Sequence, residues 1–246
     1  MASGIRGLSF PVVAQVTVGL ALSYGGCIDA SKRVAATPQE QAPAPNACAK
    51  GIRPAPDGAL DDAEDNDTEL TKVGGRDGYW FTSADPNGST ILPTPFKMSD
   101  GGAGGSKHAV HVSGQTSATN GAWGVLLGAN MVQAGAYDAS PYVGIAFKAK
   151  VGAHSANKVR FKVGDVNTHP DGGVCKSCWN HFGKDLTLSS DWQEYRVSFA
   201  EMTQEAGWGD KVPAVTPGKL LSINWSIGPG QTYDLWLDDI VFFECL

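Results

Sequence analysis

The sequence predicts an all-β domain, an antiparallel β-sandwich of jelly-roll form. Several short segments alternate apolar and polar side chains, and no long segment repeats the spacing of an amphipathic helix. Glycine supplies 31 of the 246 residues and charged residues only 18%, which is typical of strands joined by tight turns. Because each segment has one apolar face, we expect two sheets packed face to face.

Residues 1–27 predict an export signal. Arg6 precedes an apolar run from Leu8 to Leu22, whose length suits the apolar region of a signal peptide better than a spanning helix. The following residues up to Cys27 resemble the lipobox of bacterial lipoproteins, although Tyr24 stands where an aliphatic residue is usual. Lipidation of Cys27 and plain cleavage nearby both stay open. We expect an outer-membrane or cell-surface lipoprotein, or a secreted protein.

Residues 28–58 predict a tether, because this Ala- and Pro-rich stretch has too few large apolar side chains to fold alone. The folded domain is then expected over residues 59–246. A net charge of −6 and a pI near 5.3 argue against nucleic-acid partners and a polybasic membrane-binding surface. Membrane contact is expected only through an N-terminal lipid, and the domain is expected to be a monomer.

Residues 233–243 form the clearest predicted strand, since they are rich in aromatic and branched side chains and lack Gly and Pro. Asp238 and Asp239 lie among apolar neighbours there, where a carboxylate requires a specific partner. A second acidic run covers residues 60–70. If the two segments lie side by side, they supply oxygen ligands for a structural Ca²⁺. The candidate ligands are Glu64, Asp67, Asp238 and Asp239. The alternative is a solvated acidic loop.

Seven further segments are expected as strands or strand-like: 78–82, 108–113, 121–127, 142–150, 159–163, 192–199 and 221–227. Their outward side chains are polar without being uniformly charged, so neighbouring strands would present a face that hydrogen-bonds hydroxyl-rich ligands. An ordinary solvated face is the alternative. The ligand-binding candidates on these strands are Tyr142, Arg160, Lys162, Arg196 and Asn224.

Tryptophans divide into two expected groups. Trp208 lies between two glycines, and an exposed indole stacks on the flat faces of sugar rings, so Trp208 is the first aromatic candidate. Trp225 and Trp236 share strand faces with aliphatic residues and are expected in the core.

Four short motifs carry a resemblance to a known group of proteins. Residues 60–67, 74–80, 192–199 and 235–240 look like landmarks of galactose-binding-like jelly rolls, and most resemble carbohydrate-binding modules related to family 11. The resemblance covers about residues 60–243. It implies glycan binding on one concave sheet face, and Ca²⁺ binding by Glu64 with Asp238 or Asp239. Ala63 departs from the pattern, since those modules often have Phe there.

Four cysteines remain when Cys27 is set aside, and they allow three disulfide pairings. The simplest scheme joins Cys48 to Cys245 and Cys175 to Cys178. An oxidising destination favours disulfides.

The loop that contains Cys175 and Cys178 also carries His169, Trp179 and His181. A zinc site formed by the two thiolates and the histidines is the less favoured alternative to a disulfide. His181 is a further candidate for contact with a ligand.

The function expected from these features is non-catalytic binding of a polysaccharide or glycan outside the cell. The conspicuous acids gather in the candidate metal site and not across a cleft, and no Gly-x-Ser-x-Gly motif occurs. Two alternatives stay open: a structural surface lipoprotein that binds another protein, and a glycoside hydrolase or lyase of jelly-roll form.

Overall fold

The computed structural model describes Cys48 and residues 50–246. These residues belong to one compact unit. The expected signal peptide, the lipobox cysteine and most of the expected tether lie outside the described residues. The first strand begins at Ile52, so residues 52–58 belong to the folded domain and not to the tether.

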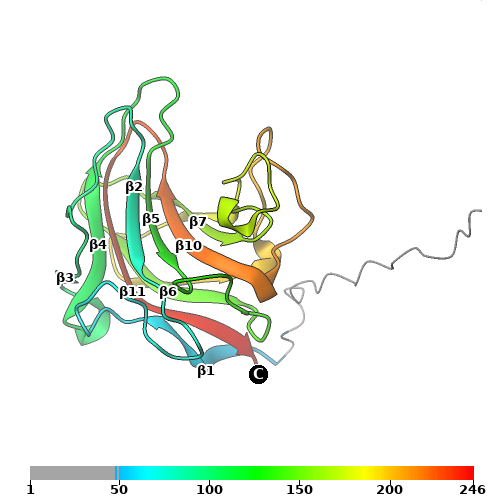
Figure 1. Ribbon diagram of the computed structural model, residues 1–246. Helices are drawn as coiled ribbons and strands as arrows, with labels where there is room; N and C mark the ends of the chain where they lie inside the picture. The colour runs from blue at the N-terminus through cyan, green and yellow to red at the C-terminus, as the bar shows by residue number, and fades with distance from the viewer. Residues whose placement is uncertain (1–47, 49) are drawn as a thin grey trace, which may run out of the picture. The chain divides into compact units, whose positions relative to one another are not determined.

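Within the described residues, two antiparallel sheets pack face to face, as predicted (Figure 1). The six-stranded sheet contains β1 (Ile52–Asp61), β3 (Ser99–Asp100), β4 (His108–Gln115), β6 (Gly144–Val151), β9 (Gln193–Ser198) and β11 (Thr232–Cys245). The five-stranded sheet has the order β2 (Trp80–Ala84), β5 (Val125–Asn130), β10 (Leu220–Ile227), β7 (Lys158–Asp165) and β8 (Phe182–Thr187). Short 3₁₀ turns are η2 (Ala103–Gly105), η3 (Pro170–Gly172), η4 (Phe199–Glu201) and η5 (Pro217–Lys219).

Strand β11 organises the six-stranded sheet, as the sequence predicts for residues 233–243. Its first half pairs with β4, its second half pairs with β1, and β6 runs along its other edge. The first and last strands of the domain therefore lie side by side.

A β-bulge at Asp238 and Asp239 divides β11 into two phases. The register against β6 shifts between Asp238 and Val241, and Asp239 has a φ of 48°. Leu235 and Leu237 are buried before the bulge, whereas Ile240 and Phe242 are buried after it. One extra residue reverses which side chains face inward. Trp236 therefore lies on the outer face, where it stacks on His111, and its predicted place in the core is wrong.

The core between the sheets is built around Trp225, which is fully buried as predicted. Phe147 of β6 meets its ring edge-on with centroids 5.2 Å apart, and Phe161 of β7 lies 5.0 Å away. Trp80 of β2 stacks on it at 5.9 Å. Aromatic rings from four strands thus pack the two sheets against each other. The other face of the five-stranded sheet is therefore directed away from the core.

Both predicted disulfides are present, Cys48–Cys245 and Cys175–Cys178. The first ties the start of the described chain to the end of β11, and the second closes a tight loop between β7 and β8. Across the described residues, no helix has the length and apolar character needed to span a membrane.

Candidate functional site

A groove of about 1410 Å³ runs over the outer face of the five-stranded sheet. Its floor consists of side chains from all five strands, and its walls consist of the loops that flank them. Loops between β7 and β8 and between β9 and β10 gather on this side of the molecule (Figure 1). The groove residues used below are Tyr79, Phe81, Trp123, Arg160, Lys162, Trp179, His181, Asp185, Glu205, Trp208, Asn224 and Ser226.

The middle of the floor follows from strand register. Asn224 of β10 lies opposite Gly128 of β5 on one side and Lys162 of β7 on the other. A Cβ at Gly128 would lie 2.5 Å from both the Asn224 Oδ1 and the Phe81 Cζ atoms, so glycine lets these two side chains lie over the strand. The floor therefore places an aromatic ring, an amide and an ammonium in one row.

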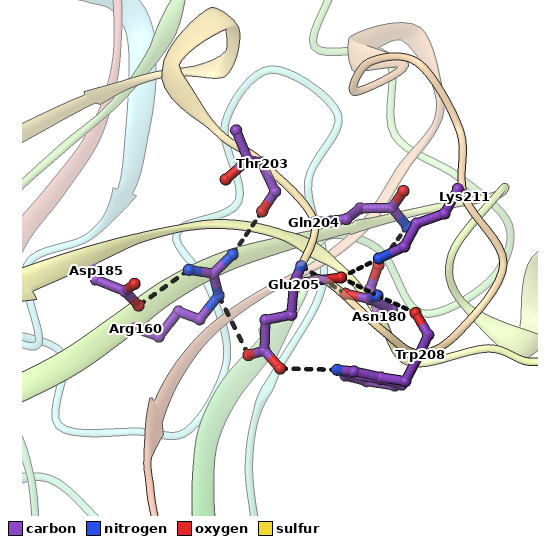
Figure 2. A network of polar contacts seen from close by, with 8 residues as sticks. All are labelled: Arg160, Asn180, Asp185, Thr203, Gln204, Glu205, Trp208 and Lys211. Atoms are coloured by element: carbon purple, nitrogen blue, oxygen red, sulfur yellow. Dashed lines mark hydrogen bonds and ion pairs between the residues drawn. The ribbon is translucent and has the colours of Figure 1, made fainter.

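One wall is held rigid by the buried side chain of Asn180, which ties the two loops together (Figure 2). Its Nδ2 donates to the carbonyl oxygens of Glu205 and Trp208, at 2.9 Å and 2.6 Å, and its Oδ1 accepts from the Glu205 N–H at 3.0 Å. Gln204 adds a second brace, since its Nε2 donates to the Asn180 carbonyl oxygen at 2.6 Å. This wall is fixed before any ligand arrives.

Glu205 links the wall to the floor (Figure 2). One carboxylate oxygen accepts from the Trp208 indole Nε1 at 2.9 Å, and the other lies 3.4 Å from the Arg160 Nε. The Arg160 guanidinium also pairs with Asp185 at 2.9 Å and donates to the Thr203 carbonyl oxygen. These contacts set the direction of the Trp208 ring, and 43% of this residue remains exposed to solvent.

Exposed aromatic side chains gather at this groove. Among the described residues, the aromatic side chains that are exposed are Tyr79, Trp123, Trp179 and Trp208, with 43–55% of each accessible, and all four line the groove. Trp179 also has a φ of 76°, a left-handed conformation that is costly for a bulky residue. The chain thus holds this indole outward against a local conformational preference.

Two basic groups in the floor are perturbed by burial. Burial lowers the pKa of Lys162, partly offset by the charge of Glu205. Burial also lowers the pKa of His181 to about 3, with smaller contributions from Lys162 and His169. His181 is therefore neutral at pH 7, and its Nδ1 lies 3.0 Å from the Thr168 hydroxyl.

The structure brings together most of the predicted ligand-binding residues. Arg160, Lys162, His181, Trp208 and Asn224 all line the groove, although they come from two strands and two loops.

Two predicted ligand-binding residues lie elsewhere. Tyr142 precedes β6 and is buried against Phe242, with ring centroids 4.4 Å apart, so it belongs to the core. Arg196 lies on β9 in the six-stranded sheet, where it pairs with Glu194. Tyr142 lies outside the strand, so alternation does not apply to it. Arg196 lies on the other sheet because alternation along a strand gives its two faces but not the sheet to which it belongs.

The predicted metal ligands are only partly brought together. Glu64 Oε1 accepts from the Ser106 hydroxyl and from the Lys107 and His108 N–H groups, each at 2.8 Å. Asp238 Oδ2 accepts from the Ala103 N–H at 2.7 Å, so both carboxylates contact residues 103–108. Burial raises the pKa of Asp238, and a nearby cation would offset that effect. The two carboxylates thus contact the same loop, and Ca²⁺ binding there stays a prediction.

The other two predicted metal ligands do not fit. Asp239 points to the outer face, where its Oδ2 pairs with the Lys148 Nζ at 2.6 Å. Asp67 is exposed and accepts from the Glu69 N–H in its own turn. The bulge directs Asp238 and Asp239 apart, and the described residues contain no group of three or more His, Cys, Asp or Glu side chains suited to a metal. The zinc alternative is wrong because Cys175 and Cys178 are joined to each other.

Sequence reasoning missed several groove residues. Tyr79 and Phe81 flank buried Trp80, so strand alternation alone predicts that they face outward. Trp123 lies in a glycine-rich loop before β5 and shows no periodic signal. The bracing role of Asn180 depends on two loops that are distant in sequence, and no local pattern reveals it.

Comparison with known proteins gives structural likeness only. No family model and no curated protein sequence matches the chain. A family 11 carbohydrate-binding module of a cellulosomal cellulase of Clostridium thermocellum superposes with a TM-score of 0.50 and 16% identity, over 72% of this chain and 93% of that chain. The chain therefore shares the fold of family 11 carbohydrate-binding modules.

Two further solved structures fall just below that level of similarity. A family 11 module from Clostridium thermocellum, in complex with a β-1,3-1,4-mixed-linked tetrasaccharide, gives a TM-score of 0.49 with 18% identity, over 68% of this chain and 89% of that chain. A family 30 carbohydrate-binding module gives a TM-score of 0.49 with 12% identity, over 67% and 80% of the two chains.

Proposed function

We propose that this protein binds polysaccharide in the groove over the five-stranded sheet and does not catalyse its cleavage. The observation that carries the proposal is that the four exposed aromatic side chains of the described residues all line this one groove. A flat ring buries the CH face of a sugar, while polar neighbours hydrogen-bond to the hydroxyl groups at its rim. The groove combines both kinds of group.

Preorganisation supports the same proposal. Asn180 and Glu205 fix the loop that carries Trp208, and the strained backbone at Trp179 holds a second indole outward. A rigid site loses less conformational entropy when a ligand binds. Within the domain the Trp179 ring meets only the edges of the His169 and His181 rings and stays 55% exposed, so we attribute the strain to ligand contact.

The arrangement of acids favours binding over hydrolysis. Glycoside hydrolysis uses two carboxyl groups placed on either side of the scissile bond. Asp185 and Glu205 are instead both engaged by the single Arg160 guanidinium. The fold shared with a carbohydrate-binding module fits a binding role, although fold alone does not fix function.

The proposal is tested by affinity electrophoresis and calorimetry against a panel of soluble plant, algal and bacterial polysaccharides. We expect wild-type protein to bind at least one polymer, and Trp208→Ala and Trp179→Ala to weaken that binding about tenfold. Trp192→Ala is the matched control, because Trp192 contacts Lys150 and does not line the groove.

Each outcome of this panel separates the alternatives. Release of sugar products would favour an enzyme. Failure to bind any polymer, together with capture of one protein in a way that requires Trp208, would favour a protein-binding role. Equal weakening by Trp192→Ala would place the site outside the groove.

The proposal includes export from the cytoplasm. The two disulfides suit an oxidising compartment. Fatty-acid labelling of wild type and Cys27→Ala in a bacterial host tests whether Cys27 carries a lipid anchor. Label on wild type alone would support the anchor, and label on both proteins or on neither would rule it out.

A further inference from the structure

The groove floor contains donor groups that the protein leaves without acceptors. No hydrogen bond or ion pair within the described residues engages the Lys162 Nζ, although the side chain lies among residues of the groove. The buried Ser226 Oγ also lacks a hydrogen-bond partner there, and the Arg160 Nε makes no hydrogen bond, since the Glu205 carboxylate lies 3.4 Å away. Ser226 and Arg160 are register neighbours on β10 and β7, and Lys162 lies two residues from Arg160. The Lys162 ammonium, the Ser226 hydroxyl and the Arg160 Nε therefore form one patch of hydrogen-bond donors that have no hydrogen-bond acceptor among the described residues.

The fold keeps Lys162 down in the floor. A Cβ at Gly183 of β8 would lie 2.8 Å from the Lys162 Cγ, so the aliphatic stem of the lysine lies over this glycine. A lysine whose aliphatic stem is buried normally extends its ammonium group into water. Here the ammonium is partly desolvated, since burial lowers the Lys162 pKa. Leaving a desolvated cation without an acceptor is unfavourable unless a ligand supplies one.

Nearby acids do not fill this role. Asp185 lies 2.9 Å from the Arg160 Nη1, and Glu205 is shared between Arg160 and the Trp208 indole. Glu205 acts on Lys162 only through space and makes no contact with it. Asp171, the third acidic residue that lines the groove, lies beside His169. Lys158 also lines the groove, and its ammonium donates to the Thr187 hydroxyl. Lys162 is therefore a cation of the floor whose ammonium has no acceptor among the described residues.

A carboxylate or sulfate satisfies such a patch better than a hydroxyl group does. Sugar hydroxyls both donate and accept, whereas an anionic group only accepts and also brings the opposite charge. We propose that the ligand is an acidic polysaccharide, whose carboxylate or sulfate group binds Lys162 beside Arg160 and Ser226 while adjacent sugar rings stack on the groove tryptophans. This inference rests on the proposed function and specifies its ligand class.

The experiment compares polymers that differ only in charge. Calorimetry measures wild-type protein with polygalacturonate and its methyl ester, and with a sulfated galactan and its desulfated form. We expect at least one anionic polymer to bind tenfold or more tightly than its neutral counterpart, and this preference to shrink as NaCl is raised. A preference for polygalacturonate over its methyl ester would indicate a carboxylate ligand, and a preference for the sulfated galactan would indicate a sulfate ligand.

Variants connect the preference to one side chain. Lys162→Met should remove the preference, and Lys162→Arg should retain most of it. Lys97→Met is the matched control, since Lys97 is an exposed lysine that does not line the groove. Lys162→Met should melt at or above the wild-type temperature, because it removes a desolvated charge, and this measurement verifies folding.

Two results overturn the inference while leaving the proposed function intact: equal affinity for charged and neutral forms, or a preference that survives in Lys162→Met. Failure to bind any polymer, charged or neutral, overturns the proposed function itself.

Discussion

The neutral state of His181 predicts that the domain loses stability in mild acid. His181 is 4% exposed, and burial lowers its pKa from 6.5 to about 3. In the unfolded chain the same imidazole takes up a proton as the pH falls below 6.5, while in the folded protein it stays neutral. The unfolded state therefore binds more protons, and stability falls as the pH decreases from 6.5 towards 3.

The size of the effect follows from the two pKa values. Each pH unit below 6.5 costs about 1.4 kcal/mol, so at pH 5 the His181 contribution amounts to about 2 kcal/mol. Other groups titrate in the same window. Burial raises the Asp61 pKa to about 7, which favours the folded state in acid. Only the difference between wild type and a His181 variant isolates the histidine.

Urea unfolding followed by tryptophan fluorescence at pH 7.5 and pH 5.0 measures this difference. We expect His181→Gln to lose about 2 kcal/mol less than wild type between the two pH values. His154→Gln, which replaces an exposed histidine, should keep the wild-type pH dependence. An unchanged pH dependence in His181→Gln would refute the assignment of a buried neutral imidazole.

Two further predictions concern the extremities of the domain. A chelator should lower the melting temperature of wild type and of the control Asp67→Ala, but not of Glu64→Ala, because a bound cation stabilises only a protein that can hold it. An unchanged wild-type melting temperature would show the calcium prediction to be wrong. Replacing both cysteines of Cys48–Cys245 by serine should lower the free energy of unfolding by about 5 kcal/mol, since that bond joins residues 197 apart, against about 2 kcal/mol for Cys175–Cys178. Similar losses in the two urea titrations would contradict this reasoning.

The sequence was sufficient for the fold class because strand alternation is a local signal. Ile145, Phe147 and Ala149 are buried in β6, and Ile223 and Trp225 are buried in β10, as their spacing predicts. The same signal failed in β11, where one extra residue at Asp239 reverses the phase and moves Trp236 to the outer face. A bulge depends on pairing with neighbouring strands, and no single-strand pattern contains that information.

The site was only partly predictable, for a related reason. Arg160, Lys162 and Asn224 lie in register across β7 and β10, so their outward faces coincide. Arg196 shows the same alternation but belongs to the opposite sheet. Sheet membership depends on long-range pairing, and the wall that orients Trp208 depends on Asn180, which contacts it only in the folded chain.

The central claim is that the groove over the five-stranded sheet receives the polysaccharide. Indole N–H resonances in a ¹H–¹⁵N spectrum, recorded while a bound polymer fragment is added, test it directly. The account predicts shifts for Trp123, Trp179 and Trp208, which line the groove, and none for Trp192 and Trp236, which contact Lys150 instead. Shifts confined to Trp192 and Trp236 would place the ligand on the six-stranded sheet and contradict the account.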